Sequence, residues 1–197
     1  MLLWNDRFSE PGYAYGTQPN DFLTEVSHKI DGTNVLSVGE GEGRNAVYLA
    51  GQGFAVTAID SASVGLRKAE ALAYESGVSI QTIVSDLADY DPRFGVWDGI
   101  VSIFCHLPST IRINLHKKLV DSLKPGGVLI LEAYTPAQLD YKTGGPKQLD
   151  FFMTLEGLQS ELSGLTFEIA REVEREIHEG RYHNGQSAVV QLLARKL

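Results

Sequence analysis

The sequence has little of several features that mark common protein classes. Cys105 is the only cysteine, so no disulfide can form within the chain, which fits a reducing compartment. Basic residues number 17 against 25 acidic ones, and the absence of a basic run disfavours a nucleic-acid partner, because phosphate binding needs a basic face. No apolar run approaches the roughly 20 residues that cross a bilayer, and segment 1–7 turns polar too soon for a signal peptide. We therefore expect a cytoplasmic protein without a membrane partner.

Glycine stands out against this background. An apolar run at 35–38 stops at three alternating glycines, Gly39, Gly41 and Gly43, and a helical pattern follows them. Glycines let the backbone turn sharply and let a ligand approach with no side chain in the way. The turn leads into a helix N-terminus, where unpaired N–H groups face the ligand. The segment therefore predicts a strand, a ligand-binding turn and a helix.

An acidic residue completes this unit. A second apolar strand, 54–59, ends on Asp60, which lies 21 positions after Gly39 and can accept hydrogen bonds from both hydroxyls of a ribose. A dinucleotide-binding turn has its third glycine three positions after Gly41, and Arg44 occupies that position here. A nicotinamide-dependent oxidoreductase therefore remains an alternative that fits the pattern less well.

Helices and strands alternate along the rest of the chain. Asn20 or Asp21 predicts the start of a helix through Ile30. Periodicity predicts further helices at 61–76, from Pro108 or Ser109 to 123 and at 154–162, and strands at 79–84, 94–104, 128–134, 165–176 and 187–197. Asn184-Gly185 predicts a hairpin turn before the last strand. The expected fold class is α/β, a three-layer Rossmann-like sheet of seven strands, parallel except for an antiparallel last strand, with helices on both faces.

Three phrases of the sequence resemble one family of enzymes. Val-Gly-x-Gly-x-Gly-Arg-Asn at 38–45, Lys-Pro-Gly-Gly at 124–127 and Leu-Leu-Ala-Arg-Lys at 192–196 are similar to class I S-adenosylmethionine-dependent methyltransferases, most of all to the small tellurite-resistance and thiopurine-type group. The resemblance covers 34–197. It implies S-adenosylmethionine as the cofactor and methyl transfer to a small-molecule acceptor, such as a thiol, a chalcogen or another soft nucleophile.

The resemblance also implies which residues bind the cofactor. These are Gly39, Glu40, Gly41, Gly43, Asp60, Ser61, Asp86, Leu87 and Ser102. Asp86 would meet the adenine amino group, and the alternative is that it caps the turn 87–90. Members of the family often have an acid where this chain has Ser37, near the methionine amino group. Either Glu40 or Glu42 compensates, or cofactor affinity is weakened.

His106 is the candidate catalytic residue. It follows the fourth predicted strand, where a neutral imidazole could accept a proton from the acceptor. The alternative is a rim histidine held by structural hydrogen bonds. Cys105 is a weaker candidate because nothing nearby in the sequence clearly lowers the pKa of its thiol.

The acceptor is expected to meet the irregular, aromatic-rich segments. The candidate substrate residues are Tyr15, Tyr134, Tyr141, Arg181 and His183. The 197 residues predict a single domain over 1–197, in which 1–31 is an N-terminal arm and helix and 135–153 is a substrate loop. The arm is expected either to pack on the core or to cover the cofactor.

The last expectations from the sequence concern metal binding, catalytic activity and oligomeric state. The spacing of His178 and His183 is not a zinc signature, so no metal is predicted. A non-catalytic S-adenosylmethionine-binding protein remains an alternative because of Ser37. The chain is expected to be a monomer or a dimer.

Overall fold

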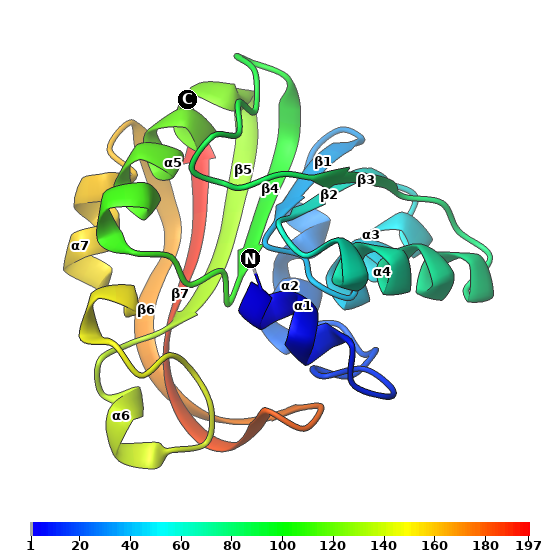
Figure 1. The fold of residues 1–197 in the computed structure, drawn as a ribbon. Helices are drawn as coiled ribbons and strands as arrows, with labels where there is room; N and C mark the ends of the chain where they lie inside the picture. The colour runs from blue at the N-terminus through cyan, green and yellow to red at the C-terminus, as the bar shows by residue number, and fades with distance from the viewer. Residues whose placement is uncertain (1) are drawn as a thin grey trace.

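A computed structural model describes residues 2–197 and contains one seven-stranded sheet (Figure 1). The strands are β1 (Asn34–Val38), β2 (Ala55–Asp60), β3 (Gln81–Val84), β4 (Trp97–Ile103), β5 (Leu123–Tyr134), β6 (Leu165–Glu179) and β7 (His183–Lys196). Their order in the sheet is β3-β2-β1-β4-β5-β7-β6. The pairs among β1 to β5 are parallel, whereas β7 runs antiparallel to both β5 and β6. The predicted fold class is therefore confirmed. Met1, part of the N-terminal segment, lies outside the described residues.

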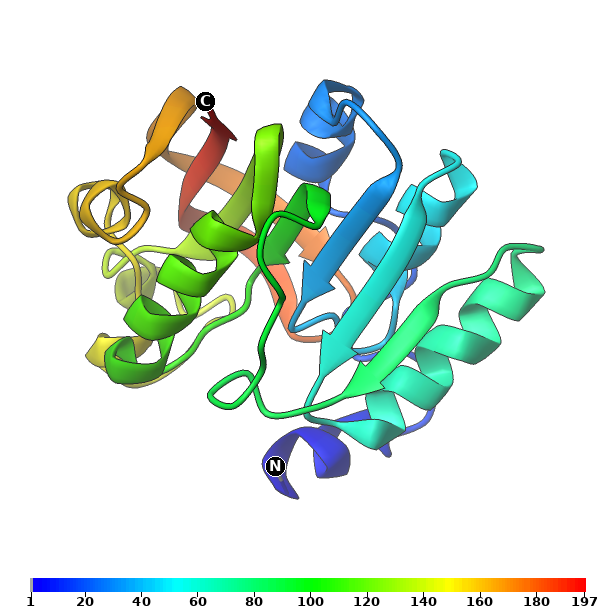
Figure 2. The same cartoon turned by 90° about the horizontal axis from the view of Figure 1, so that it is seen from above.

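Helices cover both faces of this sheet (Figure 2). They are α1 (Leu2–Phe8), α2 (Asp21–Val26), α3 (Arg44–Gly51), α4 (Ser63–Glu75), α5 (Ser109–Ser122), α6 (Gln138–Tyr141) and α7 (Leu155–Glu161), with short 3₁₀ turns at Ser27–Lys29 and Leu149–Phe151. No helix within residues 2–197 is both long and apolar enough to span a bilayer.

Strand β5 shows why the chain forms three layers. Its side chains alternate between two cores, because successive residues of a strand point to opposite faces. Val128 and Ile130 pack with α2, α3 and α4, whereas Leu129 and Leu131 pack with α5 and α7, and all four are fully buried. A strand buried on both faces reads as a continuous apolar run, as this one does.

Local capping signals are correct at two helices. The Asn20 side chain accepts a hydrogen bond from the backbone N–H of Leu23 at 3.0 Å and begins α2. The Thr154 hydroxyl accepts one from the N–H of Gly157 at 3.1 Å and begins α7. Each cap satisfies one of the N–H groups that a helix start leaves free.

Two segments expected to be irregular contain helical turns. Residues 2–8 form α1, and the 135–153 segment contains α6 and the 3₁₀ turn at Leu149–Phe151. These elements are short, so tertiary contacts rather than propensity hold them in place.

The fifth strand also starts earlier than predicted, because Leu123 pairs with Trp97 ahead of a bulge.

The prediction of the terminal hairpin turn is wrong. The turn is formed by Gly180-Arg181-Tyr182, and Asn184-Gly185 lies within β7 opposite β6. The Arg181 N–H donates to the carbonyl of Ala14 at 2.9 Å, and the Asn184 N–H donates to that of Thr143 at 3.0 Å. These tertiary contacts override the local preference of Asn-Gly for a tight turn.

Candidate functional site

A cavity of about 680 Å³ opens at the carboxyl ends of β1, β2 and β4. The glycine turn forms one wall, α1 and Tyr15 form a second, and residues 144–148 with Phe151 form a third. This is the edge at which open α/β sheets bind ligands, and the volume lies within the roughly 300–1,000 Å³ typical of small-molecule sites.

The glycine turn needs two of its glycines for different reasons. Gly39 lines the cavity with a φ of +63°, and a Cβ there would lie 2.6 Å from the Sγ of Cys105. Gly43 precedes α3 with a φ of +95°, and a Cβ there would lie 2.6 Å from Ala69 of α4. Gly43 is not among the described residues that line the cavity. It lets α3 approach α4 instead of touching a ligand.

Asp60 faces the cavity at the end of β2. One carboxylate oxygen accepts from the N–H of Gly41 at 2.9 Å and the other from the N–H of Ala62 at 2.8 Å. Burial raises the pKa of Asp60, and its hydrogen bonds with backbone N–H groups oppose this shift. A carboxylate has about four acceptor sites, so Asp60 can still accept from a ligand. Ser61 lines the cavity beside it.

Glu40 is the acid that lies against Ser37. Its carboxylate accepts a hydrogen bond from the Ser37 hydroxyl and others from the N–H groups of Asn45, at 3.2 Å, and Ala46, at 3.0 Å. Burial raises its pKa, and it lines the cavity. A carboxylate on these N–H groups also favours the start of α3.

Glu42 is held differently from Glu40. It accepts from the N–H of Ala14 at 2.6 Å and pairs with Lys68 at 2.9 Å, and so ties the N-terminal arm to α4. Glu40 and Glu42 were both considered as replacements for the acid that Ser37 displaces. Only Glu40 of these two contacts Ser37.

The third strand leads to Asp86 and Leu87, and both line the cavity. One Asp86 oxygen accepts from the N–H of Ala88 at 2.9 Å, so the residue caps its turn and still has a second oxygen free. Ser102 is buried in β4 and is not among the described residues lining the cavity. Phe104 and His106, which follow β4, line the cavity in its place.

The N-terminal arm both packs on the core and covers the cavity. Trp4, Arg7, Phe8 and Tyr15 line it, and the Arg7 guanidinium donates to the Tyr15 hydroxyl at 2.9 Å. Phe8 is buried against the glycine turn, where a Cβ on Gly41 would lie 3.0 Å from its ring. The two alternatives for the arm are therefore compatible.

His106 lines the cavity, but both of its ring nitrogens face backbone groups. Nδ1 lies 2.9 Å from the carbonyl oxygen of Phe151, which can only accept, so Nδ1 carries the proton. Nε2 then accepts from the N–H of Tyr134 at 3.4 Å. Burial lowers the pKa of His106 to about 4. The geometry favours the structural alternative, because the lone pair that a base would use points at an amide.

His183 has a different arrangement. Its Nδ1 lies 3.3 Å from Glu179, and the carboxylate of Glu179 pairs with Arg44 at 2.8 Å. The ring lies against Tyr15, with centroids 4.5 Å apart, and against Phe104, at 4.8 Å. Burial lowers the pKa of His183, and Glu179 opposes that shift. Nε2 has no hydrogen-bond partner among the described side chains and backbone groups.

Among the described residues, three candidate substrate residues do not line the cavity. Tyr134 is fully buried beneath Gly145, whose added Cβ would lie 2.9 Å from its ring. Tyr141 is partly exposed, and the neighbouring Glu174 raises the pKa of its phenol. Arg181 sits in the hairpin turn and pairs with Glu10 at 3.1 Å.

Several residues at the site were not identified from the sequence. They are Trp4, Arg7, Arg44, Phe104, Phe151 and Glu179. Phe104 has a φ of +51°, a conformation that costs energy and that clusters at functional sites. Glu179 carries a usable signal, because an acid and a histidine flank Gly180-Arg181-Tyr182 and face each other once the turn is placed there.

Two other chemistries receive little support from the geometry. Burial raises the pKa of the Cys105 thiol to about 12, so it is protonated and a poor nucleophile. Within residues 2–197, no group of three or more His, Cys, Asp or Glu side chains is arranged to hold a metal ion.

Comparison with known proteins agrees with the fold. A family model described as a methyltransferase domain matches residues 35–127. This match, the strand order, the glycine turn after β1 and Asp60 at the end of β2 identify residues 35–127 as a class I S-adenosylmethionine-dependent methyltransferase domain. S-adenosylmethionine is the cofactor of that family, which does not support the nicotinamide-dependent alternative.

The individual relatives share low sequence identity with this chain. The chain is 27% identical over 144 residues to 2-heptyl-1-hydroxyquinolin-4(1H)-one methyltransferase from Mycobacteroides abscessus, which covers 70% of this chain and 62% of that protein. It is 31% identical over 122 residues to a ubiquinone biosynthesis O-methyltransferase from Rickettsia conorii, covering 61% of this chain and 41% of that protein. The solved structure of TehB from Haemophilus influenzae superposes with a TM-score of 0.75 at 20% identity, covering 98% of this chain and 66% of that one. The chain thus spans less than two thirds of the length of both curated relatives.

Proposed function

We propose that this protein transfers a methyl group from S-adenosylmethionine to a hydroxyl group of a small aromatic molecule. The observation that carries the proposal is the continuity of the cavity. It runs from Asp60 and the glycine turn to an aromatic end formed by Tyr15, Phe104 and His183. One cavity can therefore hold a nucleoside cofactor and an acceptor side by side.

The residues present suit the cofactor. When bound, S-adenosylmethionine supplies an electrophilic methyl group on a sulfonium centre. Asp60 would hold the ribose hydroxyls, and Asp86 and Leu87 would meet the adenine. The carboxylate of Glu40 would meet the methionine amino group, in place of the acid that this chain lacks at Ser37. The Cβ-free surface of Gly39 leaves space for close approach of the ligand.

The walls of the cavity favour a small acceptor. Trp4 and Phe8 of α1 cover one side, and the segment 144–148 covers another. Two hydrogen bonds hold this segment in place: the Gln138 side chain donates to the Gly144 carbonyl within the loop, and the Thr143 hydroxyl donates to the Gln186 carbonyl of β7 at 2.7 Å. Covering walls exclude water and fix the orientation of the reactants, which can supply roughly 7–11 kcal/mol of the barrier reduction.

The acceptor atom is oxygen in this proposal rather than a thiol or chalcogen. The soft-nucleophile hypothesis is supported by the sequence resemblance, and the likeness to TehB concerns the fold alone. The names of the two curated relatives refer to a hydroxyquinolone methyltransferase and an O-methyltransferase. The available Nε2 of His183 also favours an acceptor that must lose a proton.

Binding and transfer assays test the proposal together. Calorimetry is expected to detect binding of S-adenosylhomocysteine and no comparable binding of NAD⁺. Incubation with methyl-labelled S-adenosylmethionine should then label a phenol or an N-hydroxyquinolone. Preference for NAD⁺ would favour the oxidoreductase. Binding of S-adenosylhomocysteine without transfer to any hydroxyl or thiol probe would favour a non-catalytic binder.

A further inference from the structure

Resting on the proposed function, we propose that His183 is the general base of the reaction, and that Glu179 and Arg44 position its imidazole so that Nε2 takes the proton of the acceptor hydroxyl. None of the three residues belongs to the glycine turn or to the strand ends that hold the nucleoside. They meet because β6 and β7 form a hairpin whose turn is short enough to pair Glu179 with His183.

The neighbour of Nδ1 determines the tautomer of His183. The carboxylate of Glu179 can only accept a hydrogen bond, so the Nδ1 atom 3.3 Å from it carries the proton. Nε2 is then unprotonated and holds a lone pair. A base that is oriented by a third group through its other nitrogen is the arrangement general-base catalysis needs.

Nε2 of His183 is accessible to a ligand. Among the described residues, the Tyr134 hydroxyl is the one fully buried polar side-chain atom that lacks a hydrogen-bond partner. Nε2 of His183 also lacks one, so it is not fully buried. His183 lines the cavity, and its Cδ2 atom, bonded to Nε2, faces Gly144 of the cavity wall, where an added Cβ would lie 3.0 Å away. We therefore infer that an acceptor in the cavity can reach Nε2.

Several charged groups surround the imidazole of His183. Glu179 of β6 faces it with a negative charge, while Arg44 of α3 and Arg7 of α1 oppose protonation. Tyr15 and Tyr134 contribute neutral rings. His106 lies near enough for the two histidines to disfavour double protonation. Desolvation and the arginines outweigh the effect of Glu179, so the pKa of His183 lies below its usual value and the ring is neutral at neutral pH, as a base must be.

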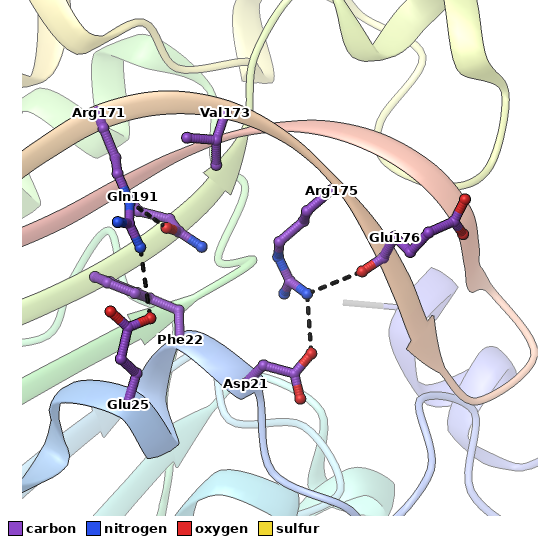
Figure 3. A pocket seen from close by; sticks show the side chains of 8 residues that line it. All are labelled: Asp21, Phe22, Glu25, Arg171, Val173, Arg175, Glu176 and Gln191. Atoms are coloured by element: carbon purple, nitrogen blue, oxygen red, sulfur yellow. Dashed lines mark hydrogen bonds and ion pairs between the residues drawn. The ribbon is translucent and has the colours of Figure 1, made fainter.

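A buried polar network holds Glu179 in place. The Asn20 side chain donates to Glu179 at 3.0 Å and also to Glu132, which is fully buried. Arg175 pairs with Glu132 at 2.8 Å. It also reaches Asp21 at 3.0 Å (Figure 3). Arg44 completes the set at 2.8 Å. Glu179 therefore cannot turn away from His183 without breaking several charge-assisted hydrogen bonds.

The proton balance of the step is simple. The acceptor O–H bond breaks, its proton goes to Nε2, and the oxygen electron pair forms the new bond to the methyl carbon as the carbon–sulfur bond breaks. His183 leaves the step as imidazolium paired with Glu179 and returns its proton to water. A phenol with a pKa near 10 gains from this base, whereas a thiol with a pKa near 8.5 is already partly ionised at neutral pH.

The experiment compares oxygen and sulfur acceptors on the same ring. The kcat/KM of wild-type protein, His183→Asn and Glu179→Gln is measured against pH with a phenol and with the matching thiophenol. His178→Asn is the control, because that side chain lies exposed on the same hairpin. His183→Asn is expected to lose about 10²- to 10⁴-fold with the phenol and little with the thiophenol, with unchanged affinity for S-adenosylhomocysteine.

Glu179→Gln tests the positioning role separately. Removing the carboxylate takes away the group that raises the pKa of His183, so the acid limb of the phenol profile should move to lower pH. A merely structural role would lower the rate without moving that limb. An unmoved limb in a folded variant overturns the positioning of His183 by Glu179.

A measurement on the wild-type protein without cofactor keeps the inference testable if the variants fail to fold. Nitrogen NMR of the imidazoles is expected to show His183 as the Nδ1-protonated tautomer with a pKa below the usual value for a histidine. An Nε2-protonated ring overturns the inference, as does a His183→Asn variant with full phenol activity or equal losses on both acceptors. A wild-type protein that methylates neither probe overturns the proposed function itself, whereas losses confined to His183→Asn bear on the base alone.

Discussion

At the scale of single residues, Asp60 and Glu40 divide the recognition of the cofactor. Each is a carboxylate held by backbone N–H groups, Glu40 buried and Asp60 partly buried, and desolvation raises the pKa of both. The position of Asp60 followed from its spacing after the glycine turn. The role of Glu40 did not, because nothing in the sequence distinguished it from Glu42 until their different partners were known.

Asp60→Asn should weaken binding of S-adenosylhomocysteine by about 1.5–3 kcal/mol, the range for hydrogen bonds to a charged group. The substitution keeps the size of the side chain and removes the charge that the ribose hydroxyls would meet. Calorimetry gives the affinity, and Asp89→Ala, in an exposed turn, is the control. Unchanged affinity would mean that Asp60 does not hold the ribose.

Glu40→Gln should weaken the same ligand about 10-fold or more, since it removes a charge-assisted hydrogen bond. The sharper test uses 5′-methylthioadenosine, which lacks the amino-acid part of the cofactor. Its affinity should not change in this variant. Equal losses with both ligands would show that Glu40 supports α3 rather than the methionine amino group.

Substitution of His106 should change the free energy of unfolding rather than the rate of methyl transfer. Its pKa is about 4 in the folded protein, against about 6.5 when unfolded. Between those values the unfolded chain binds more protons, so stability falls as pH drops through this window and levels off below it. We expect about 1–3 kcal/mol of pH-dependent stability to be absent in His106→Asn. Denaturant titrations from pH 7 to pH 4 measure it, with His28→Asn at the surface as control. An unchanged slope would contradict this account.

At the scale of elements, the terminal hairpin shows where local signals fail. Asn184-Gly185 is a strong turn signal, yet the turn lies at Gly180 because the N-terminal arm and the loop at Thr143 bond the hairpin there. A turn at Asn184-Gly185 would not have placed Glu179 opposite His183. The register, and with it the candidate base, depended on contacts distant in the sequence.

Gly180→Ala should destabilise the docking of the hairpin on the N-terminal arm. A Cβ there would lie 2.5 Å from the Ala14 carbonyl oxygen and the Gly16 nitrogen, at a φ of +66°. Gly77→Ala is a matched control, because its φ is +70° and nothing lies within 4 Å of the added atom. We expect Gly180→Ala to cost about 1–3 kcal/mol more than the control, the usual cost of overpacking. Thermal and denaturant unfolding measure both variants, and equal costs would contradict the contact.

At the scale of the whole molecule, periodicity predicted more than side-chain identity did. The alternation of strands and helices from 34 to 134 was sufficient to predict a parallel sheet, because strands buried on both faces read as apolar runs. The order of the strands became known only from the structure. Residues 2–8 and 138–141 were not predicted as helical, because such short helices form only through packing on the rest of the fold. These short elements close the cavity, so the lining of the acceptor end was the part least accessible to sequence analysis.

A crystal structure of the protein with bound S-adenosylhomocysteine tests the central claim most directly. The claim is that one cavity orients the cofactor so that its sulfur faces the acceptor end. We predict the ribose hydroxyls on Asp60, the amino group on Glu40, and the sulfur open toward Phe104 and His183. A ligand bound elsewhere, or a sulfur turned away from the aromatic end of the cavity, would contradict the account.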